Sequence, residues 1–407
     1  MISAFVRKYR ASYAGLPRDA WALSFILFIN MSGTMVVFFL TLYLTRHLGF
    51  TVVRAGQVLS GYGFGMLLGN LLGGLASDRL GARRTQRLSL ALSGAFLISL
   101  GFFKDFPSVL AFMFLYGVSA AALFPANASA LAEICAPEIR SRGFVLSRLA
   151  NNLGVTIGPV VGGFLAGRHY GLLFWVDGMT SLLAALAFFI MFPSDRRSGA
   201  VAAKEKRPRP LAWRCDGVMI SILLLTIGLS TVFIQLFGTF PLFMKAAYGL
   251  SERLIGPLFA VNTVLIVIFQ MPLTHGVERF KRGRVAASGA VFLGAGLGLL
   301  PLGRGALYAA ATVAVWTLGE MLIMPTLVTM ISLRAPEGAQ GQYQGAFGLA
   351  FGIGYILGPA LGTHLYEASG GTVLWLAAAG LCSAIATGFL VLSRTEALRS
   401  GGEGEAA

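Results

Sequence analysis

Two carboxylic acids lie inside the long apolar runs of this 407-residue sequence, where ionisable side chains are few. Glu320 lies in the run 307–331 with Trp316 one helical turn earlier, and Asp177 lies in the run 173–192. A charge at the centre of a hydrocarbon layer costs about 2.5–3.5 kcal/mol, so an acid there is a candidate functional group. These residue types predict proton exchange at Glu320 and Asp177. The alternatives are a buried Glu320 held by hydrogen bonds from a neighbouring helix, and an interfacial Asp177.

A cluster of polar residues in the run 144–166 indicates a binding cavity. Arg148, Asn151 and Asn152 are three and four residues apart, which puts them on one face of a helix. They line a cavity for a solute, or Arg148 reaches back to the membrane surface. An aromatic cavity with few fixed polar groups suits amphipathic molecules. Other side chains expected to line it are Asn30, Tyr62, Asn127, Gln235, Asn262, Trp316 and Tyr355.

These side chains are carried by a very apolar chain, in which 56% of the residues are hydrophobic and 12% are charged. Runs of about 20 apolar residues are long enough to cross a bilayer as helices, and they are too long for barrel strands. The sequence predicts an all-α membrane protein with twelve transmembrane helices, centred on 20–43, 54–76, 88–103, 109–131, 144–166, 173–192, 217–243, 255–275, 286–302, 307–331, 343–365 and 374–393.

The second half of the chain repeats the first at a distance of about 200 residues. Duplicated halves in a very apolar chain are typical of secondary transporters. The expected domains are an N-terminal six-helix half (1–192), a cytoplasmic linker (193–214), a C-terminal six-helix half (215–395) and a disordered tail (396–407). The residues that recur include Gly154, Gly158, Pro159 and Gly162, which return as Gly354, Gly358, Pro359 and Gly362.

The recurring glycines stand four residues apart, and so do Gly61, Gly65, Gly69 and Gly73. A four-residue step keeps small residues on one helix face, where they let two helix backbones approach closely in lipid. One interpretation is close packing alone. The other is a face that moves at the interface between the halves, with helix bends at Pro159 and Pro359.

The net charge of +15 is distributed as a topology signal. Most of the 32 basic residues fall in segments on one side of the predicted membrane, including the linker. The positive-inside rule therefore predicts that both termini are cytoplasmic. Nucleic-acid binding is not expected, whereas membrane lipids are expected partners. Three cysteines and four scattered histidines give no metal-ligand spacing, so neither a metal nor a cofactor is expected, and a membrane enzyme is disfavoured.

Three stretches resemble the major facilitator superfamily, in particular its drug:proton antiporter branch with twelve spans. The first is Gly74-Leu-Ala-Ser-Asp78-Arg79-Leu-Gly81-Ala-Arg83-Arg84. The second runs from Gly154 to Gly163, and the third covers 318–325 and 335–345. The resemblance implies two rocking halves, alternating access and a multidrug efflux protein of the bacterial inner membrane. It also implies a cytoplasmic gate or latch formed by Gly74, Asp78, Arg79, Gly81 and Arg83, with Glu278 and Arg279 as the repeat counterparts.

The sequence departs from this family where Met113 stands in place of an arginine that many members carry. The expected function is proton-coupled export of amphipathic small molecules by a monomer that works by alternating access. The alternatives are a proton-coupled importer, a facilitator, or a lipid flippase for another small solute. The sequence identifies neither the substrate nor the direction of transport.

Overall fold

A computed structural model of the chain describes residues 15–136, 139–193, 216–336 and 339–402. These residues form helices joined by turns, and no β-strand occurs among them, which confirms the predicted all-α fold. The predicted linker 193–214 lies outside the described residues except for Pro193, and so do Cys215 and the tail residues 403–407.

The chain divides into two compact units. The N-terminal unit comprises Met1–Phe39 and Gly61–Glu205, and the C-terminal unit comprises Leu40–Ser60 and Lys206–Ala407. The sequence predicts instead that the whole of 1–192 belongs to one half. Residues 40–60 group with the second unit because they bond to it: the Thr41 hydroxyl donates to the Gly238 carbonyl at 2.7 Å, and the Val53 N–H donates to Glu367 at 2.8 Å.

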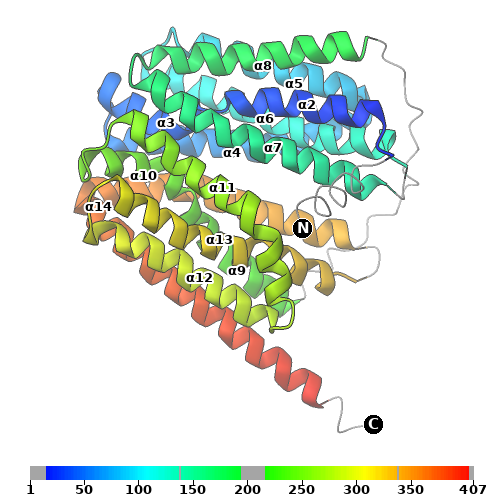
Figure 1. The fold of residues 1–407 in the computed structure, drawn as a ribbon, viewed down its shortest axis with the longest axis vertical. Helices are drawn as coiled ribbons and strands as arrows, with labels where there is room; N and C mark the ends of the chain where they lie inside the picture. The colour runs from blue at the N-terminus through cyan, green and yellow to red at the C-terminus, as the bar shows by residue number, and fades with distance from the viewer. Residues whose placement is uncertain (1–14, 137–138, 194–215, 337–338, 403–407) are drawn as a thin grey trace, which may run out of the picture. The chain divides into compact units, whose positions relative to one another are not determined.

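The helices of the N-terminal unit pack as a bundle (Figure 1). Helix α2 (Arg18–Gly33) packs against α7 (Arg140–Ala166) and α8 (Gly171–Met191). Helix α8 also packs against α5 (Ala82–Leu100), and α5 in turn contacts α6 (Phe106–Ile134). Two further helices are α3 (Val36–Leu42) and α4 (Val52–Leu80), and both cross the boundary between the units. Leu23, Leu131 and Phe188 belong to the buried core of this unit, which joins α2, α6 and α8.

Three of the glycines at the four-residue step of α4 bring its backbone against that of α6, and the fourth, Gly61, lies against the Leu110 side chain. A Cβ built at Gly69 would lie 2.9 Å from the Val118 carbonyl carbon, and one at Gly73 would lie 2.5 Å from the Ala122 Cα. Gly65 meets the Phe114 carbonyl in the same way. The four-residue step therefore produces close packing at this contact, as small residues do between membrane helices.

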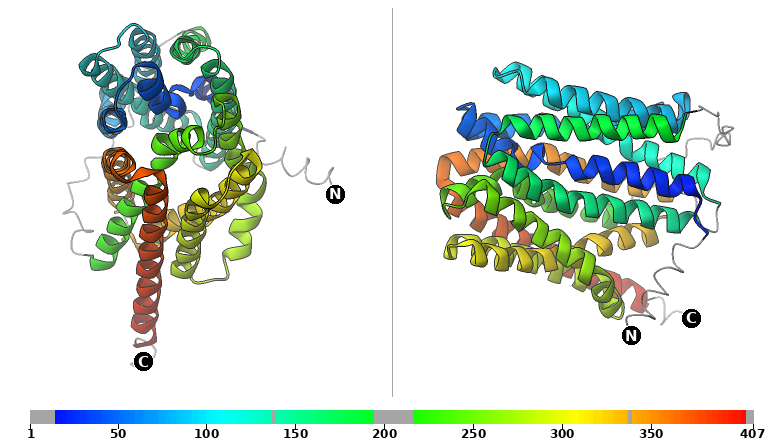
Figure 2. Two further views of the ribbon diagram at one scale, coloured as in Figure 1. Left: turned by 90° about the vertical axis from the view of Figure 1, so that its left-hand side faces the viewer. Right: turned by 45° about the horizontal axis from the view of Figure 1, so that its top comes forward.

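The C-terminal unit repeats the bundle (Figures 1 and 2). It contains α9 (Gly217–Phe233), α10 (Gln235–Ala246), α11 (Glu252–Val277), α12 (Arg282–Leu299), α13 (Ala306–Arg334) and α14 (Gln340–Gly402). Helix α12 packs against α13 and α14, and α9 packs against α14. Gly370 has a φ of +81°, so α14 is two helices joined at that residue. It continues to Gly402, past the start of the predicted tail at residue 396.

All twelve predicted spans coincide with helices of the structure, and the first is interrupted at Thr34. Ten helices of the described residues are long and apolar enough to cross a membrane, and the one at 340–394 holds two of the predicted spans. Helix α5 is not among the ten, because Arg83, Arg84 and Arg87 occupy its first turns. The chain is therefore a multi-pass membrane protein.

Candidate functional site

The N-terminal unit contains an open cavity of about 280 Å³ between α2, α6 and α7. Three residues that the sequence predicts for a binding cavity lie together in its wall: Asn127, Arg148 and Asn151. The Asn127 side chain donates to the Ser147 hydroxyl at 2.8 Å. Phe124 and Phe144, which are 41% and 40% exposed, add aromatic surface. One guanidinium, two amides and two aromatic rings are suited to a partly polar, partly apolar solute.

Asn152 is not part of that wall. Its carboxamide oxygen accepts from the Asn151 amide at 3.4 Å, so it borders the cavity through its neighbour. Arg148 and Asn151 are one turn apart on α7, as their spacing predicts.

The C-terminal unit holds Glu320 between two helices. Asn262 of α11 donates to Glu320 Oε2 at 2.8 Å and to the Thr317 hydroxyl at 3.0 Å. The Thr317 hydroxyl in turn donates to the Val313 carbonyl at 2.6 Å. Trp316, one turn before Glu320, is buried. The partly buried carboxylate is therefore the acceptor that links α13 to α11, and any change in its protonation alters that link.

Asp177 has a different environment at the junction of α2 and α3. Thr34 is extended there, with a ψ of 91°, so the helix is interrupted and the next N–H groups lose their backbone acceptors. Asp177 of α8 is 1% exposed and accepts from the Met35 and Val36 N–H groups, both at 3.1 Å. It acts as the cap of α3, which the sequence did not predict.

Asp177 has no acidic counterpart in the second half of the repeat, where Ala377 stands at the matching position. At the junction of α9 and α10, Ile234 keeps helical angles, and its N–H donates to the Ser230 carbonyl at 3.0 Å. The first helix of the C-terminal unit therefore lacks the extended residue that Thr34 provides in the N-terminal unit.

The other predicted cavity residues differ in their surroundings. Asn30 is buried, and its Oδ1 has no hydrogen-bond partner among the described residues. Tyr62 stacks on Tyr116 with ring centroids 5.6 Å apart. Tyr355 lies 5.6 Å from Phe351 in an aromatic group of the C-terminal unit.

Gln235 has a packing role in the structure. It is 3% exposed, and its amide donates to the Gly358 carbonyl at 2.6 Å and to the Thr231 carbonyl at 3.1 Å. A Cβ at Gly362 would collide with this side chain, so the glycine makes room for it. Gln235 thus fastens α10 to α14.

The recurring glycines pack inside their own units. Gly154 and Gly158 of α7 lie against Met31 and Thr34 at the interrupted first helix. In the same way, Gly354 and Gly358 of α14 lie against Ser230 and Ile234 at the junction of α9 and α10. Gly162 contacts Met35 and Phe39, and Pro159 and Pro359 lie within their helices. Both ladders therefore lie against the junction in the first helix of their unit.

The predicted gate residues cluster at the turn between α4 and α5. Gly81 has a φ of +91°, a conformation that favours glycine. Arg83 lies 3.6 Å from the Asp19 carboxylate and stacks over Phe192 at 5.0 Å. Gly74, Asp78 and Arg79 are at this end of α4, where Asp78 and Arg79 are exposed. In the repeat, Glu278 pairs with His275 at 3.3 Å and Arg279 stacks over Phe280 at 5.0 Å.

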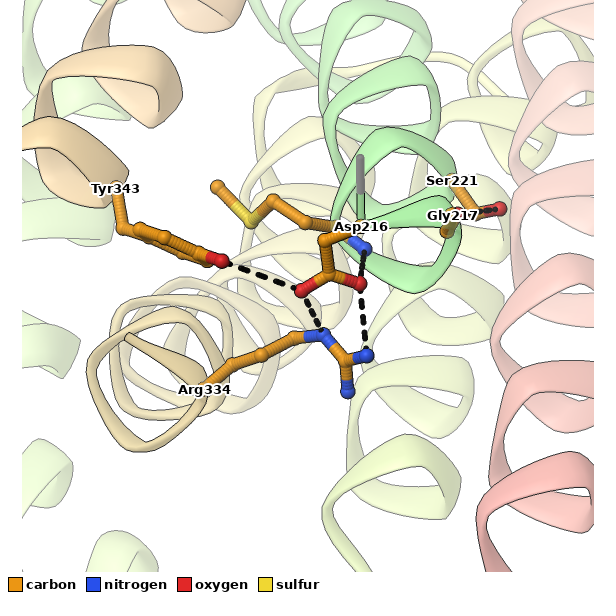
Figure 3. A network of polar contacts seen from close by, with 6 residues as sticks. Asp216, Gly217, Ser221, Arg334 and Tyr343 are labelled. Atoms are coloured by element: carbon orange, nitrogen blue, oxygen red, sulfur yellow. Dashed lines mark hydrogen bonds and ion pairs between the residues drawn. The ribbon is translucent and has the colours of Figure 1, made fainter. Parts of the chain in front are cut away.

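A polar network that the sequence did not predict ties three helices of the C-terminal unit together (Figure 3). Asp216 caps α9 by accepting from the Met219 N–H at 3.1 Å. It also receives two bonds from Arg334 of α13, at 2.6 and 2.7 Å, and one from the Tyr343 hydroxyl of α14 at 3.4 Å. Burial raises the pKa of Asp216, but the Arg334 and backbone bonds outweigh it and lower the pKa overall. An aspartate directly before an apolar run is the signal that could have identified it.

Comparison with known proteins adds the family context. The model of the Major Facilitator Superfamily matches residues 22–359. The chain is 28% identical to the uncharacterized MFS-type transporter YttB of Bacillus subtilis (strain 168), over 81% of this chain and 84% of that protein. It is 25% identical to a Na(+), Li(+), K(+)/H(+) antiporter of Planococcus maritimus, over 78% and 82% of the two chains. It is 24% identical to the multidrug resistance protein MdtH of Aeromonas salmonicida (strain A449), over 68% and 69%.

Two solved structures have the same fold. The nucleoside transporter NupG superposes with a TM-score of 0.78 at 14% identity, over 92% of this chain and 99% of that chain. A peptide transporter POT in complex with sulfate gives a TM-score of 0.77 at 16% identity, over 94% and 95%. At these identities the likeness concerns the fold alone.

Proposed function

Because the chain belongs to the Major Facilitator Superfamily of membrane transporters, we propose that it exports amphipathic small molecules in exchange for protons. The proposed mechanism is alternating access, in which the two states differ in their affinity for substrate and proton. The observation that carries the proposal is the hydrogen bond at 2.8 Å between Asn262 of α11 and Glu320 of α13.

This bond makes the contact between the two helices sensitive to a proton. An ionised Glu320 accepts from the Asn262 amide, whereas a protonated carboxyl group also presents a donor that needs an acceptor. The Asn262 carboxamide can supply that acceptor only by reorienting, which changes its second bond to Thr317. A proton therefore favours one arrangement of α11 and α13 over the other, which is the differential interaction that coupling requires.

The substrate class follows from the cavity of the N-terminal unit. Arg148, Asn127 and Asn151 supply few polar groups, and Phe124 and Phe144 add aromatic surface to the wall. Such a site binds by burial of apolar surface and discriminates weakly among substrates. The relative named a multidrug resistance protein and the relative named a cation/H(+) antiporter are consistent with this proposal.

Orientation and gating complete the proposal. Both termini are cytoplasmic in the bacterial inner membrane, as the distribution of basic residues predicts. Asp78 and Arg79 belong to a latch that holds the cytoplasmic side closed in one state, together with Arg83 and the repeat pair Glu278 and Arg279. A single chain carries out transport.

Transport in proteoliposomes tests this function. The purified protein is reconstituted, and the uptake of a panel of cationic and neutral amphipathic dyes is followed under imposed pH gradients. We expect a lumen more acidic than the medium to drive dye uptake, and a protonophore to abolish it. Uptake driven only by an alkaline lumen would identify symport, and uptake indifferent to the gradient would identify a facilitator; either result contradicts the proposal.

A further inference from the structure

The C-terminal unit contains a second cavity, and Glu278 is the one residue of its wall that the proposed transport mechanism also uses. This cavity lies between α11, α12 and α13, and its volume is about 420 Å³. We call it the α11–α13 crevice. It is lined by apolar side chains, three threonines and two charged residues: Thr274, Val277, Glu278, Phe280, Arg282, Val285, Met321, Leu322, Pro325, Thr326 and Thr329.

The crevice lies in the half in which α11 lacks the glycine steps of α4. In the N-terminal unit, Gly65, Gly69 and Gly73 bring α4 into backbone contact with α6. The repeat positions on α11 are Leu265, Phe269 and Leu273, so the glycine contact is not repeated there. Polar side chains make the contact instead, through Asn262 and through the Gln270 amide, which donates to the Met321 carbonyl at 3.0 Å. Below Gln270 the space between the helices stays open.

The mouth of the crevice is basic. Arg282 is part of its wall, and the same turn between α11 and α12 carries Arg279, Lys281 and Arg284. The acid at this turn, Glu278, is engaged by His275 at 3.3 Å. The net positive charge is complementary to an anionic group, and in a membrane protein it stands where a lipid headgroup would lie.

The inside of the crevice combines apolar and polar side chains. Val277, Val285, Met321 and Leu322 form the apolar wall. Further along α11, the side chains of Ile268, Phe269 and Met271 are 55%, 49% and 71% exposed. An acyl chain can bury apolar surface against the apolar wall of the crevice, which a small hydrophilic anion cannot do.

We propose that the α11–α13 crevice binds one anionic phospholipid. The phosphate lies at the basic turn, where the guanidinium of Arg282 binds it, as arginine commonly does with phosphate oxygens. One acyl chain lies in the crevice against Val285, Met321 and Leu322. The lipid occupies the space that the glycine contact removes in the other half.

A photoreactive phosphatidylglycerol with a diazirine on one acyl chain tests this site in the purified full-length protein in detergent. We expect label on peptides that contain 277–285 and 321–329, with competition by unlabelled phosphatidylglycerol. We expect Arg282→Gln to lower the apparent affinity for phosphatidylglycerol about fivefold, because it removes the attraction of one basic side chain for an anionic headgroup. Glycerol phosphate and inorganic phosphate should not compete, since they have no acyl chain.

Arg284→Gln is the matched control, because it removes the same charge from the same turn at an exposed position outside the crevice wall. It should lower the affinity less than Arg282→Gln does, because it removes a charge from the turn without removing a direct contact with the phosphate. Equal losses in Arg282→Gln and Arg284→Gln would mean surface attraction only and would overturn the proposal. Label distributed over other helices, or full competition by phosphate alone, would overturn it as well.

A second pair of variants tests the acyl chain. Thr326→Phe fills the crevice, whereas Thr326→Val keeps the shape of the side chain and removes its hydroxyl. We expect the first to abolish specific labelling and the second to keep it. If Thr326→Phe does not fold, the comparison of the labelling affinities of Arg282→Gln and Arg284→Gln still tests the proposed site.

Discussion

The contact between α4 and α6 and the contact between α11 and α13 occupy equivalent places in the repeat, yet they are built in opposite ways. The first is a backbone contact through glycines, where a Cβ at Gly69 would lie 2.9 Å from the Val118 carbonyl carbon. The second is held by side chains, through Asn262 with Glu320 and through Gln270 with the Met321 carbonyl. One duplicated scaffold thus supplies a rigid contact in one half and an adjustable, ionisable contact in the other.

The comparison teaches where chemistry can enter a duplicated bundle. Small residues at a four-residue step leave no room for a polar side chain between two helices. Leu265, Phe269 and Leu273 stand at the repeat positions, and in that half an acid with its amide partner joins α13 to α11. The proposed proton site and the α11–α13 crevice both lie in the half that lacks these glycines.

The largest expected effect is on the glycine contact itself. Gly69→Leu would drive a large side chain into the backbone of Val118 in α6, and we expect it to cost about 3 kcal/mol or more. Thermal unfolding in detergent and the yield of folded protein measure this loss. The matched variant is Phe269→Leu at the repeat position, where the side chain is 49% exposed, and it should change the stability by less than about 1 kcal/mol. Similar losses in the two variants would contradict the comparison.

The next effect concerns the interrupted first helix. Asp177→Leu leaves the Met35 and Val36 N–H groups buried without an acceptor, at an expected cost of about 2–3 kcal/mol. Asp177→Asn keeps one acceptor oxygen and should recover most of that stability, which thermal unfolding measures. If the asparagine variant were as unstable as the leucine variant, the capping role would be wrong.

A smaller effect distinguishes two acids at the start of the first helix of each unit, Asp19 in the first turn of α2 and Asp216 at the cap of α9. Asp216→Asn weakens a two-bond contact with Arg334, in which the two side chains are 14% and 28% exposed, and should cost about 1–2 kcal/mol. Asp19 contacts Arg83 at 3.6 Å and is 52% exposed, so Asp19→Asn should cost less than about 1 kcal/mol. A larger loss in Asp19→Asn would reverse this part of the comparison.

The Asp216 contribution should also depend on pH. Because the Arg334 and backbone bonds lower the pKa of the folded carboxyl group, ionised Asp216 stabilises the fold above the unfolded pKa of about 4. That stabilisation is lost as the pH falls through the lowered, folded pKa. The difference in unfolding temperature between the wild type and Asp216→Asn should therefore shrink as the pH is lowered from about 5 to below the pKa of the folded carboxyl group. A difference that is constant with pH would mean that the charge of Asp216 does not contribute.

The helices of the two halves could be predicted from the sequence, because each follows from an apolar run or a residue spacing within one segment of the chain. The twelve spans, the glycine steps of α4, and the pairing of Arg148 with Asn151 on one face could all be predicted from residue spacing. Membrane helices satisfy their backbone internally, so a long apolar run has few alternatives to a helix.

The rest depends on contacts between distant residues. The extended Thr34 that interrupts the first span has no local signal, and the capping of α3 by Asp177 follows only from that interruption. Residues 40–60 join the C-terminal unit through bonds such as that from Val53 to Glu367, which no spacing rule contains. Gln235 was predicted for a cavity because it is polar in an apolar run, whereas the structure uses it to hold α14.

Glu320→Gln in proteoliposomes is the most direct measurement of the central claim, that the adjustable contact of α11 and α13 carries the coupling proton. The amide keeps the size of the side chain and removes its titration. We expect pH-gradient-driven accumulation of the dye to be lost while dye exchange without a gradient persists, and we expect Asp177→Asn to retain gradient-driven transport. Full gradient-driven accumulation by Glu320→Gln would contradict the account.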